Sequence, residues 1–333
     1  MPANTKLTSA EISQTWGAYL NTSLSNKVLM YFRAKVEDAD IRPIIQEAFN
    51  LSQSHINQLT AIFETEGIPV PYGFRDEDVN TDAPRLYSDN YFLQHIMQLG
   101  QLGMQSYSMA ISGSTRPDIY AFFTEGFSDY NQLHQRAVTT ALSKGIYTRP
   151  PTIPTPTRRD FVKKQNFLTG WFGKRRPLLA VEVANLFENI QRNALGAATI
   201  TGFSQVAKSK EVRDYFKRGV DIANKHVEIF SSVLREDDIV APSGSDTFVT
   251  AESTNAPFSD KLMMFHTTGM ITLGIGFYGL SISTNIRRDL ATHYLRLTEE
   301  IMLYSEDGAN ITIDNGWLEE PPRMVDRNKL AND

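Results

Sequence analysis

The chain of 333 residues contains no cysteine. This absence excludes disulfide bonds, thiolate metal ligands and cysteine nucleophiles together. An excess of positive charge is also missing, because 33 Lys and Arg stand against 38 Asp and Glu, for a formal net charge of −5. Nucleic-acid binding needs a basic surface, so we expect no nucleic acid among the partners of this protein.

Leader and membrane-spanning sequences are missing too. The N-terminus, MPANTKLTSAEI, contains no apolar signal core, which predicts a cytoplasmic protein without a signal peptide. Two stretches, 90–115 and 262–286, carry no Asp, Glu, Lys or Arg and have the length of a membrane span. Their Gln, His, Thr and Asn side chains argue against a transmembrane segment. They instead predict helices of roughly 25 residues that are surrounded by other helices.

The two uncharged stretches belong to an internal repeat. Shifting the chain by 171 residues without a gap superposes 88–118 on 259–289, with ten identities in about thirty positions. Matched pairs at this offset include Ser88 and Ser259, His95 and His266, Tyr107 and Tyr278, His55 and His226, and Gly145 and Gly316. A repeat of this length predicts that the second half of the chain is a structural copy of the first.

Each half carries the signals of four helices. Thr8 and Glu11 form a capping-box pattern at the start of the first helix, and Gly67 predicts the end of the second. The connection 67–87 is about twenty residues long, whereas the other connections within this half are short. One long connection between the second and third helices is typical of a four-helix bundle with a single crossover. We therefore predict an all-α fold of two tandem four-helix bundles.

We expect the bundles to occupy residues 1–151 and 177–333, joined by a linker at 152–176. The linker contains seven Lys or Arg and a single Asp, with aromatic residues among them. The aromatic residues are Phe161, Phe167, Trp171 and Phe172. This composition allows peripheral contact with an anionic membrane surface. The alternative is a linker whose aromatic rings pack on the bundles and whose charges neutralise their acidic surfaces.

The uncharged helices predict buried stripes with helical spacing. The first stripe is Phe92, His95, Leu99, Leu102, Ser106 and Met109, and the second is Met263, His266, Met270, Leu273 and Phe277. His55 and His226 fall on the corresponding stripes of the second helices. Each bundle is therefore expected to hold two inward imidazoles.

Buried imidazoles beside carboxylates are the way helical bundles build metal sites, so a metal ion is the cofactor that the pattern allows. The candidate ligands are His55, His95 and Glu11 in the first half and His226, His266, Glu182 and Glu300 in the second. A standard di-iron or di-manganese centre needs Glu-x-x-His on two helices. The residues three before the histidines are Ser52, Phe92, Asn131, Ala223, Met263 and Leu290. None is Glu, which argues against such a centre.

Three alternatives stay open for the histidines. They could form a mononuclear metal site, bind a small anion, or lie in the core bonded to a tyrosine or threonine. Suitable core partners are Tyr19, Tyr107, Tyr278 and Thr267. Glu11 likewise has a structural role in the capping box. No pattern of Ser, His and Asp indicates a nucleophile, so we predict no catalytic residue.

Several longer motifs resemble those of a known family. They are LYSDNYFLQHI at 86–96, FVKKQNFLTGWFGKRRPL at 161–178, FSQVAKSKEVRDYF at 203–216, APFSDKLMMFHTTGMITLGIGFYG at 256–279, RRDLATHY at 287–294 and EDGANITIDNGWLEEPP at 306–322. They are similar to the tandem ferritin-like proteins of unknown function from endospore-forming bacteria, which are distantly related to spore coat protein F. The resemblance covers nearly the whole chain and implies two ferritin-like four-helix bundles. It brings no established reaction with it.

From this resemblance we expect a non-catalytic protein of sporulation that is associated with the spore coat, with spore-coat proteins as partners. The alternative is a metal-binding ferritin-like redox protein with a His-containing site in the bundle core. Long helices with Phe, Tyr and Met on more than one face would also allow a homodimer.

Overall fold

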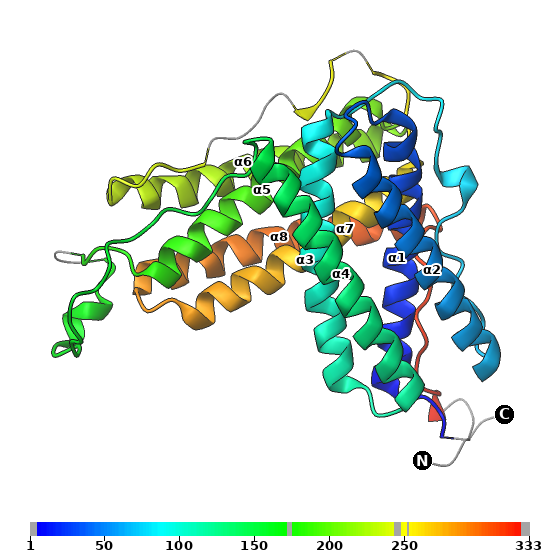
Figure 1. Cartoon of the computed structure of the whole chain (residues 1–333), viewed down its shortest axis with the longest axis horizontal. Coiled ribbons are helices and arrows are strands. Elements are labelled where there is room, and N and C mark those ends of the chain that lie inside the picture. Colours follow the sequence, from blue (N-terminus) through cyan, green and yellow to red (C-terminus); the bar gives the residue numbers. More distant parts are fainter. Residues whose placement is uncertain (1–4, 172–174, 243–247, 252, 328–333) are drawn as a thin grey trace. The chain divides into compact units, whose positions relative to one another are not determined.

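The computed structural model describes residues 5–171, 175–242, 248–251 and 253–327 (Figure 1). Across this part of the chain the long elements are eight α-helices. They are α1 (Ser9–Lys35), α2 (Arg42–Glu66), α3 (Asp89–Gly113), α4 (Pro117–Ser143), α5 (Ala180–Val206), α6 (Lys210–Glu236), α7 (Asp260–Thr284) and α8 (Arg288–Asp314). The prediction of an all-α fold is confirmed. None of the described helices combines the length and the apolar character needed to cross a membrane.

Local signals place the helix ends where the sequence predicts them. At the start of α1, the Thr8 hydroxyl accepts a hydrogen bond from the Glu11 N–H, and the Glu11 carboxylate accepts one from the Thr8 N–H, at 3.2 and 2.7 Å. α2 ends at Gly67, whose φ of 66° lies in the left-handed region that glycine adopts at little cost. Gly145 and Gly316 follow α4 and α8 with a φ of 68° each. The repeat therefore uses the same helix-ending glycine twice.

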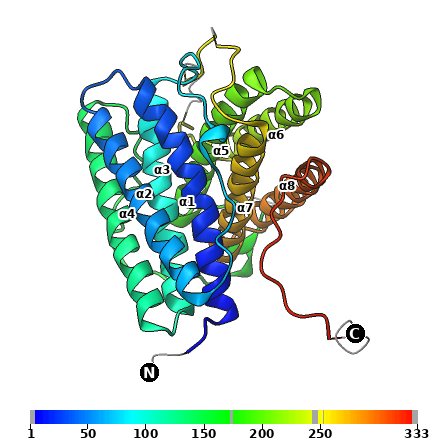
Figure 2. The ribbon, with the colours of Figure 1, turned by 90° about the vertical axis from the view of Figure 1, so that its right-hand side faces the viewer.

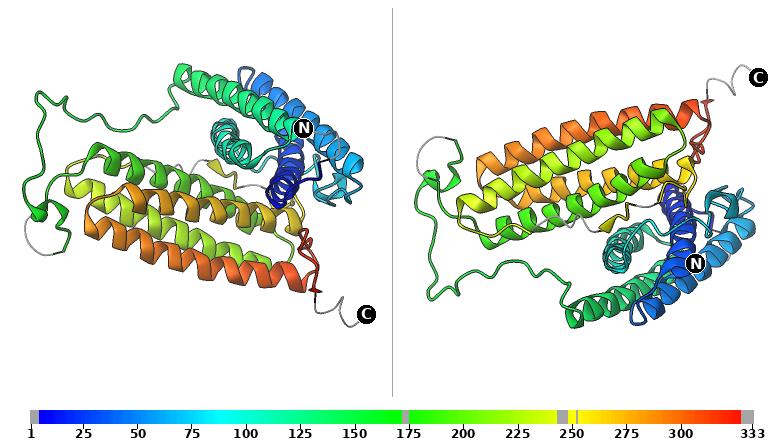
Figure 3. Two further views of the ribbon diagram at one scale, coloured as in Figure 1. Left: turned by 90° about the horizontal axis from the view of Figure 1, so that it is seen from below. Right: turned by 90° about the horizontal axis from the view of Figure 1, so that it is seen from above.

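The chain forms two compact units. The first consists of Met1–Thr81, Phe92–Ala141 and Gly316–Asp333, and the second of Asp82–Tyr91 and Leu142–Asn315. We call α1 to α4 the first bundle (Figure 2) and α5 to α8 the second bundle (Figure 3). In the second bundle, α5 packs against α6 and α7, and α8 packs against α7 and α6. Two helical hairpins joined by one long crossover make this bundle, and the predicted tandem duplication is confirmed.

The buried face of α3 differs in part from the predicted stripe. Phe92 is buried as predicted, but Met109 is 67% exposed and Ser106 is exposed as well. The helix instead buries Ile96 and Tyr107. The prediction that Ser106 and Met109 belong to the core is therefore wrong.

The equivalent helix α7 shows the same shift. Its buried residues are Leu262, Met263, Met264, Thr267, Ile271, Phe277, Tyr278 and Ser281. The predicted core residues Met270 and Leu273 are only half-buried. Neither helix has a charged face that would mark its solvent side, so hydrophobic periodicity alone does not locate the buried side.

The segment Asp82–Tyr91 packs on α5 within the second unit. Tyr87 donates a hydrogen bond to the Thr199 carbonyl at 2.7 Å, and the hydroxyls of Tyr91 and Thr199 are 2.8 Å apart. The two tyrosine rings stack with 4.0 Å between their centroids. Gly202 makes room for this pair, because a Cβ at that position would lie 2.4 Å from the Tyr87 hydroxyl oxygen. Two buried tyrosines thus anchor the end of the first crossover on α5.

The chain after Gly316 belongs to the first unit. There the Glu319 carboxylate accepts hydrogen bonds from the backbone N–H groups of Tyr72 and Gly73, at 2.7 and 3.2 Å. Tyr72 and Gly73 lie in the connection between α2 and α3, so this carboxylate satisfies backbone donors of the first crossover. Each compact unit is therefore built from residues of both repeats.

The substitution Gly202→Ala is expected to lower the free energy of unfolding by about 1–3 kcal/mol, because the added methyl group overlaps the Tyr87 side chain. Chemical denaturation followed by circular dichroism measures the loss. The matched control is Gly196→Ala on the same helix, where the described structure offers the added Cβ no contact within 4 Å outside its own helix backbone. Alanine's higher helix propensity should raise stability there by up to about 1 kcal/mol. Equal effects of the two substitutions would contradict the steric role of Gly202.

Candidate functional site

A buried histidine connects three helices in the middle of the second bundle. His226 lies on α6 and its side chain is 0% exposed. Its Nδ1 atom is 2.9 Å from the hydroxyl of Tyr278 on α7, and its Nε2 atom is 3.1 Å from Oε2 of Glu300 on α8. Both ring nitrogens therefore have partners.

The partners define the direction of each hydrogen bond. An ionised Glu300 only accepts, so Nε2 of His226 carries the proton and donates it. With this tautomer, assigned from its partners, Nδ1 accepts from the Tyr278 hydroxyl. The oxygen of that hydroxyl in turn accepts from Nδ2 of Asn193 at 2.9 Å, and Lys225 donates to Oε1 of Glu300 at 2.7 Å. We call this series of bonds, from Asn193 through Tyr278 and His226 to Glu300, the histidine chain.

The first bundle repeats the histidine chain in a looser form. His55 on α2 is 2% exposed, and its Nδ1 atom is 3.2 Å from the Tyr107 hydroxyl. Its Nε2 atom lies 3.5 Å from Oδ2 of Asp129 on α4. Gly126 on α4 makes room for the Tyr107 ring, since a Cβ at that position would lie 2.3 Å from the ring. His55, Tyr107 and Asp129 precede His226, Tyr278 and Glu300 by the repeat offset of 171 residues.

Burial determines the protonation states of the histidine chain. Burial lowers the pKa of His226, and Glu300 opposes this shift without cancelling it. Burial also raises the pKa of Tyr278 above its usual value, against the hydrogen bond from Asn193. For Glu300, burial alone would raise the pKa, but Lys225 and His226 hold it below its usual value. At neutral pH the imidazole is therefore neutral, the phenol is protonated and the carboxylate is ionised.

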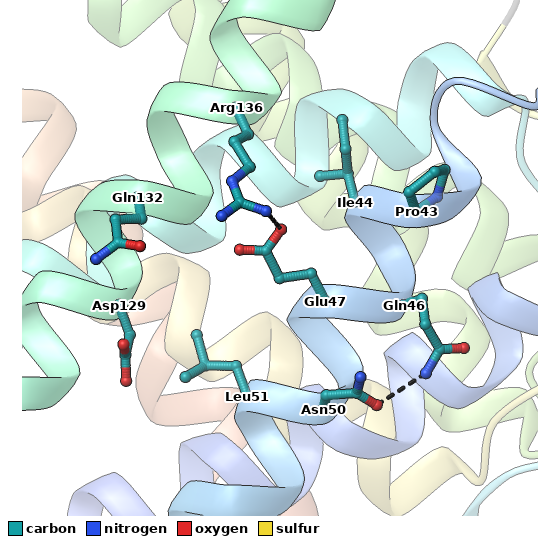
Figure 4. Close-up of a pocket in the computed structure, with 9 residues that line it drawn as sticks. All are labelled: Pro43, Ile44, Gln46, Glu47, Asn50, Leu51, Asp129, Gln132 and Arg136. Atoms are coloured by element: carbon teal, nitrogen blue, oxygen red, sulfur yellow. Dashed lines mark hydrogen bonds and ion pairs between the residues drawn. The ribbon is translucent and has the colours of Figure 1, made fainter.

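The acid end of each chain lies in a surface groove. In the first bundle a groove of about 520 Å³ between α2 and α4 is lined by Asp129 (Figure 4). In the second bundle a groove of about 370 Å³ at the equivalent place, between α6 and α8, is lined by Glu300. The Glu300 side chain is 29% exposed, whereas Tyr278 is 2% exposed. A molecule in either groove can therefore contact the carboxylate, while the imidazole and the phenol stay covered.

An ion pair crosses each groove, and its polarity is reversed between the bundles. In the first groove Arg136 of α4 binds Glu47 of α2 at 2.8 Å, as Figure 4 shows. At the same positions in the second groove, Asp307 of α8 binds Arg218 of α6 at 2.6 Å. The acidic and basic residues have exchanged helices between the two bundles, but the two positions still carry opposite charges. Both bundles therefore keep an ion pair between these two helices.

The carboxylates of Glu11 and Glu182, both considered as metal ligands, lie at the end of the bundles instead. Glu11 is 1% exposed and accepts hydrogen bonds from the backbone N–H groups of Thr115 and Arg116, at 2.8 Å each. These residues form the turn between α3 and α4. Burial alone would raise the pKa of Glu11, but the N–H donors of Thr8, Thr115 and Arg116 lower it to about 2.

Glu182 has the same role in the second bundle. It is 0% exposed and accepts from the backbone N–H groups of Leu179 and Arg287, at 2.9 and 3.1 Å. Arg176 adds two charge-assisted bonds to the same carboxylate, at 2.7 and 2.8 Å. Arg287 also binds Asp289 through two nitrogens, as Arg116 binds Asp118. We call Glu11 and Glu182 the end carboxylates.

The histidines of the third helices do not join the histidine chains. His95 packs against the ring of Phe32, with 5.1 Å between centroids, and His266 packs against Phe203 at 5.5 Å. Phe32 and Phe203 are equivalent residues on α1 and α5, so both copies use the same contact. Of the residues predicted as metal ligands, the structure brings together only His226 and Glu300. No group of three or more His, Asp or Glu side chains within the described ranges is close enough to hold a metal ion.

The basic linker is divided into two parts. Near its end, Arg175 binds Glu236 at 2.5 Å, and Arg176 binds Glu182 and lies 4.4 Å from the centroid of the Phe167 ring. Trp171 lies 6.0 Å from the His293 ring and remains 54% exposed. The earlier part is exposed, with Phe161 at 86% and Val162 at 62%. The fourth aromatic residue of the predicted set, Phe172, lies outside the described residues.

The sequence offered no signal for Asn193, the first donor of the histidine chain. Its equivalent in the first repeat is Thr22, so the offset that matches the histidines and tyrosines gives no identity there. Tyr294 on α8 was missed for the same reason, because Phe123 occupies the equivalent position.

Comparison with known proteins gives the family. A family described as "Protein of unknown function (DUF3231)" matches residues 1–158 and again 166–330. The chain belongs to this family. The two successive matches in DUF3231 agree with the tandem bundles of the structure. No curated protein matches the chain.

A solved structure of a protein named as a candidate spore coat protein, from Bacillus halodurans C-125, is similar to part of this member of DUF3231. The similarity covers 45% of this chain and 98% of the other, with a TM-score of 0.43 and 16% sequence identity.

Lowering the pH from 7 to 5 is expected to reduce the free energy of unfolding. Burial lowers the pKa of His226 below its ordinary value and that of His266 to about 4, so the unfolded chain binds more protons below about pH 6.5. The stability contributed by the neutral imidazoles is complete above that pH and is lost as the pH falls towards 4. The carboxyl of Glu11, with its pKa near 2, keeps its full contribution to stability above about pH 4.5 and loses it only at lower pH, so it does not affect the change between pH 7 and 5. Denaturant titrations at pH 7, 6 and 5 measure how steeply the free energy of unfolding falls with pH.

The variant His226→Gln is the control, because its amide can still donate to Glu300 but does not titrate. The free energy of unfolding of the variant should fall less steeply between pH 7 and 5 than that of the unchanged protein. The difference between the two slopes is at most about 1.4 kcal/mol per pH unit, the limit for one titrating group. Identical slopes for the two proteins would show that His226 has the same pKa in the folded and unfolded states.

Proposed function

We propose that the protein is a non-catalytic, tandem ferritin-like bundle protein that acts in sporulation, at or near the spore coat. The observation that carries the non-catalytic part is the state of the histidine chain. In the second bundle both ring nitrogens of His226 are already bonded within the core, to Tyr278 and Glu300. A general base must come within hydrogen-bond reach of its substrate, and this imidazole is 0% exposed.

The histidine chain is suited to fixing the packing of the bundle. A buried polar network whose members are all bonded favours one arrangement of its helices, because any rotation or slip leaves polar groups unsatisfied. The chain joins α5, α6, α7 and α8 and therefore ties one hairpin to the other. Its counterpart around His55 links α2, α3 and α4 less tightly, because Nε2 of His55 lies 3.5 Å from Asp129 and has no hydrogen-bond partner among the described residues. A role as a rigid module in an assembly is consistent with this design.

The association with sporulation rests on resemblance. The motifs at 161–178 and 256–279 are similar to those of tandem proteins from endospore-forming bacteria. A spore-coat protein would meet other coat proteins through its surface, and the two grooves lie at equivalent places on the surfaces of the two bundles. We propose that coat proteins, or a second copy of this chain, are the partners.

Fluorescence microscopy of a tagged copy, expressed from its own promoter in sporulating cells, tests the location. We expect the signal to gather around the developing spore and to remain with purified spores. A signal spread evenly through vegetative cells, and absent from spores, would contradict the spore-coat assignment.

Metal analysis tests the non-catalytic part separately. The protein is purified without a metal-affinity tag and compared with the double variant His226→Ala, His266→Ala. Stoichiometric iron, manganese or zinc that is lost in the variant would contradict a non-catalytic role and favour a metal-binding redox protein.

A second candidate function, attachment to an anionic membrane surface, is favoured by the exposed part of the linker. Phe161 and Val162 are 86% and 62% exposed. The side chains of Arg158 and Lys163 beside them are 84% and 79% exposed. Apolar side chains flanked by cations suit the boundary between lipid headgroups and acyl chains. Arg175 and Arg176 do not contribute, because they bind carboxylates of the second unit.

Sedimentation with vesicles that contain phosphatidylserine tests this attachment. The double variant Phe161→Ala, Lys163→Glu should lower the bound fraction several-fold at low salt, since it removes the most exposed large apolar side chain of the linker and reverses one charge. Lys163→Arg keeps the charge and should bind as the unchanged protein does. No sedimentation of the unchanged protein at low salt would exclude the membrane role.

A further inference from the structure

The hydroxyl of Tyr294 is buried in the second bundle without a hydrogen bond to any described residue. Tyr294 lies on α8 and is 0% exposed. Its ring packs against Phe230 and Tyr278, with 5.0 and 5.6 Å between centroids. Tyrosines usually find a partner for their hydroxyl when they are buried, so this one needs an explanation.

Polar groups surround that hydroxyl, although none of them bonds to it. Asn189, Ser281 and Asn285 are near enough to oppose the rise in the pKa of Tyr294, which burial brings to about 12. Asn189 is already committed, because its Nδ2 atom donates to the Asn185 carbonyl and to the Ser281 hydroxyl, at 2.9 Å each.

Two further donors of the second bundle are unsatisfied. Nδ2 of Asn285 is buried without a partner among the described residues, and Nε of Arg192 is in the same state. Arg192 lies within electrostatic range of both Tyr294 and Tyr278. A buried polar group without a partner is destabilising, and several in one place are rare in native cores unless another molecule binds them.

The first bundle shows that this polarity is not required by the fold. At the positions equivalent to Tyr294, Asn189 and Ser281 it has Phe123, Ala18 and Ala110. Phe123 and Ala110 are each 1% exposed, so the apolar set packs well in the same place. The second bundle therefore carries several polar replacements that converge on one point, a change that packing alone does not explain.

We propose that the second bundle contains an internal binding site for a small molecule with an acceptor oxygen, water in the first place, held by Tyr294, Asn285 and Ser281. The hydroxyl of Tyr294 can both donate and accept, and Asn285 supplies an N–H donor. The Ser281 hydroxyl already donates to the Phe277 carbonyl at 2.8 Å, so it can only accept a hydrogen bond from the bound molecule, as it can from water. An internal water typically makes about three hydrogen bonds to such groups. The first bundle has no equivalent site.

The site adjoins the histidine chain. Asn193 donates both to the Asn189 carbonyl, at 2.7 Å, and to the Tyr278 hydroxyl, at 2.9 Å. A bound molecule beside Asn189 therefore extends the polar region from the groove at Glu300 to Tyr294. This site goes beyond the proposed function, since it depends on neither a spore-coat location nor the absence of catalysis.

The decisive variant is the triple substitution Asn189→Ala, Ser281→Ala, Tyr294→Phe, which installs the residues that the first bundle already has. Magnetic relaxation dispersion of the solvent counts long-lived internal waters, and we expect the variant to have at least one fewer than the unchanged protein. The reciprocal substitution Phe123→Tyr is the control. It adds a hydroxyl without the other polar groups and should not add a long-lived water.

The single variant Tyr294→Phe gives a second measurement. If the hydroxyl is bonded to a bound molecule, its removal shifts the denaturation midpoint to lower denaturant. A midpoint that is unchanged or higher, together with an unchanged relaxation dispersion of the triple variant, would overturn the proposal. Native mass spectrometry distinguishes the occupants, because a mass adduct that the triple variant loses identifies a small oxygen-containing molecule in place of water and likewise supports the site.

Discussion

The structure depends on one buried carboxylate at the end of each bundle. A buried charge is tolerated only when it is fully bonded, and Glu11 and Glu182 meet this condition with backbone donors from both hairpins of their bundles. Each links the start of one hairpin to the turn of the other, so the helices cannot slide past one another without exposing the charge to an apolar core. This fixed register is what allows side chains from three helices to meet at mid-bundle, where the histidine chains form.

The two bundles show what duplication kept and what it changed. The end carboxylates are identical at the repeat offset, and so are the central histidine and tyrosine of each histidine chain. The ion pair across each groove differs between the bundles, because the acidic and basic residues have exchanged positions while their charges remain opposite. Around Tyr294 the second bundle has become polar where the first is apolar. The common scaffold therefore tolerates a local change of chemistry while the contacts that set its register stay the same.

Much of the fold could be predicted from local signals. The capping box at Thr8, the glycines at the helix ends and the long crossover all act within a few residues, so the sequence shows them directly. The candidate site could be predicted only in part. Helical spacing predicts that His226 is buried, and the structure brings it into contact with Glu300 at the edge of the core. For Glu11 and Glu182 the sequence does not distinguish a carboxylate that caps a turn from one that faces a ligand, because both would be buried near the start of a helix.

The helices, their ends and the duplication can be predicted without a structure, since they follow from residues close along the chain or from identity at one offset. Which faces are buried, and which side chains meet, depends on the packing of the folded bundles. His226 lies 52 residues from Tyr278 and 74 from Glu300, and their contact depends on how three helices are rotated about their axes. In α3 and α7 no charged face specifies that rotation. Only the packing of the whole bundle, with every buried polar group requiring a partner, fixes it.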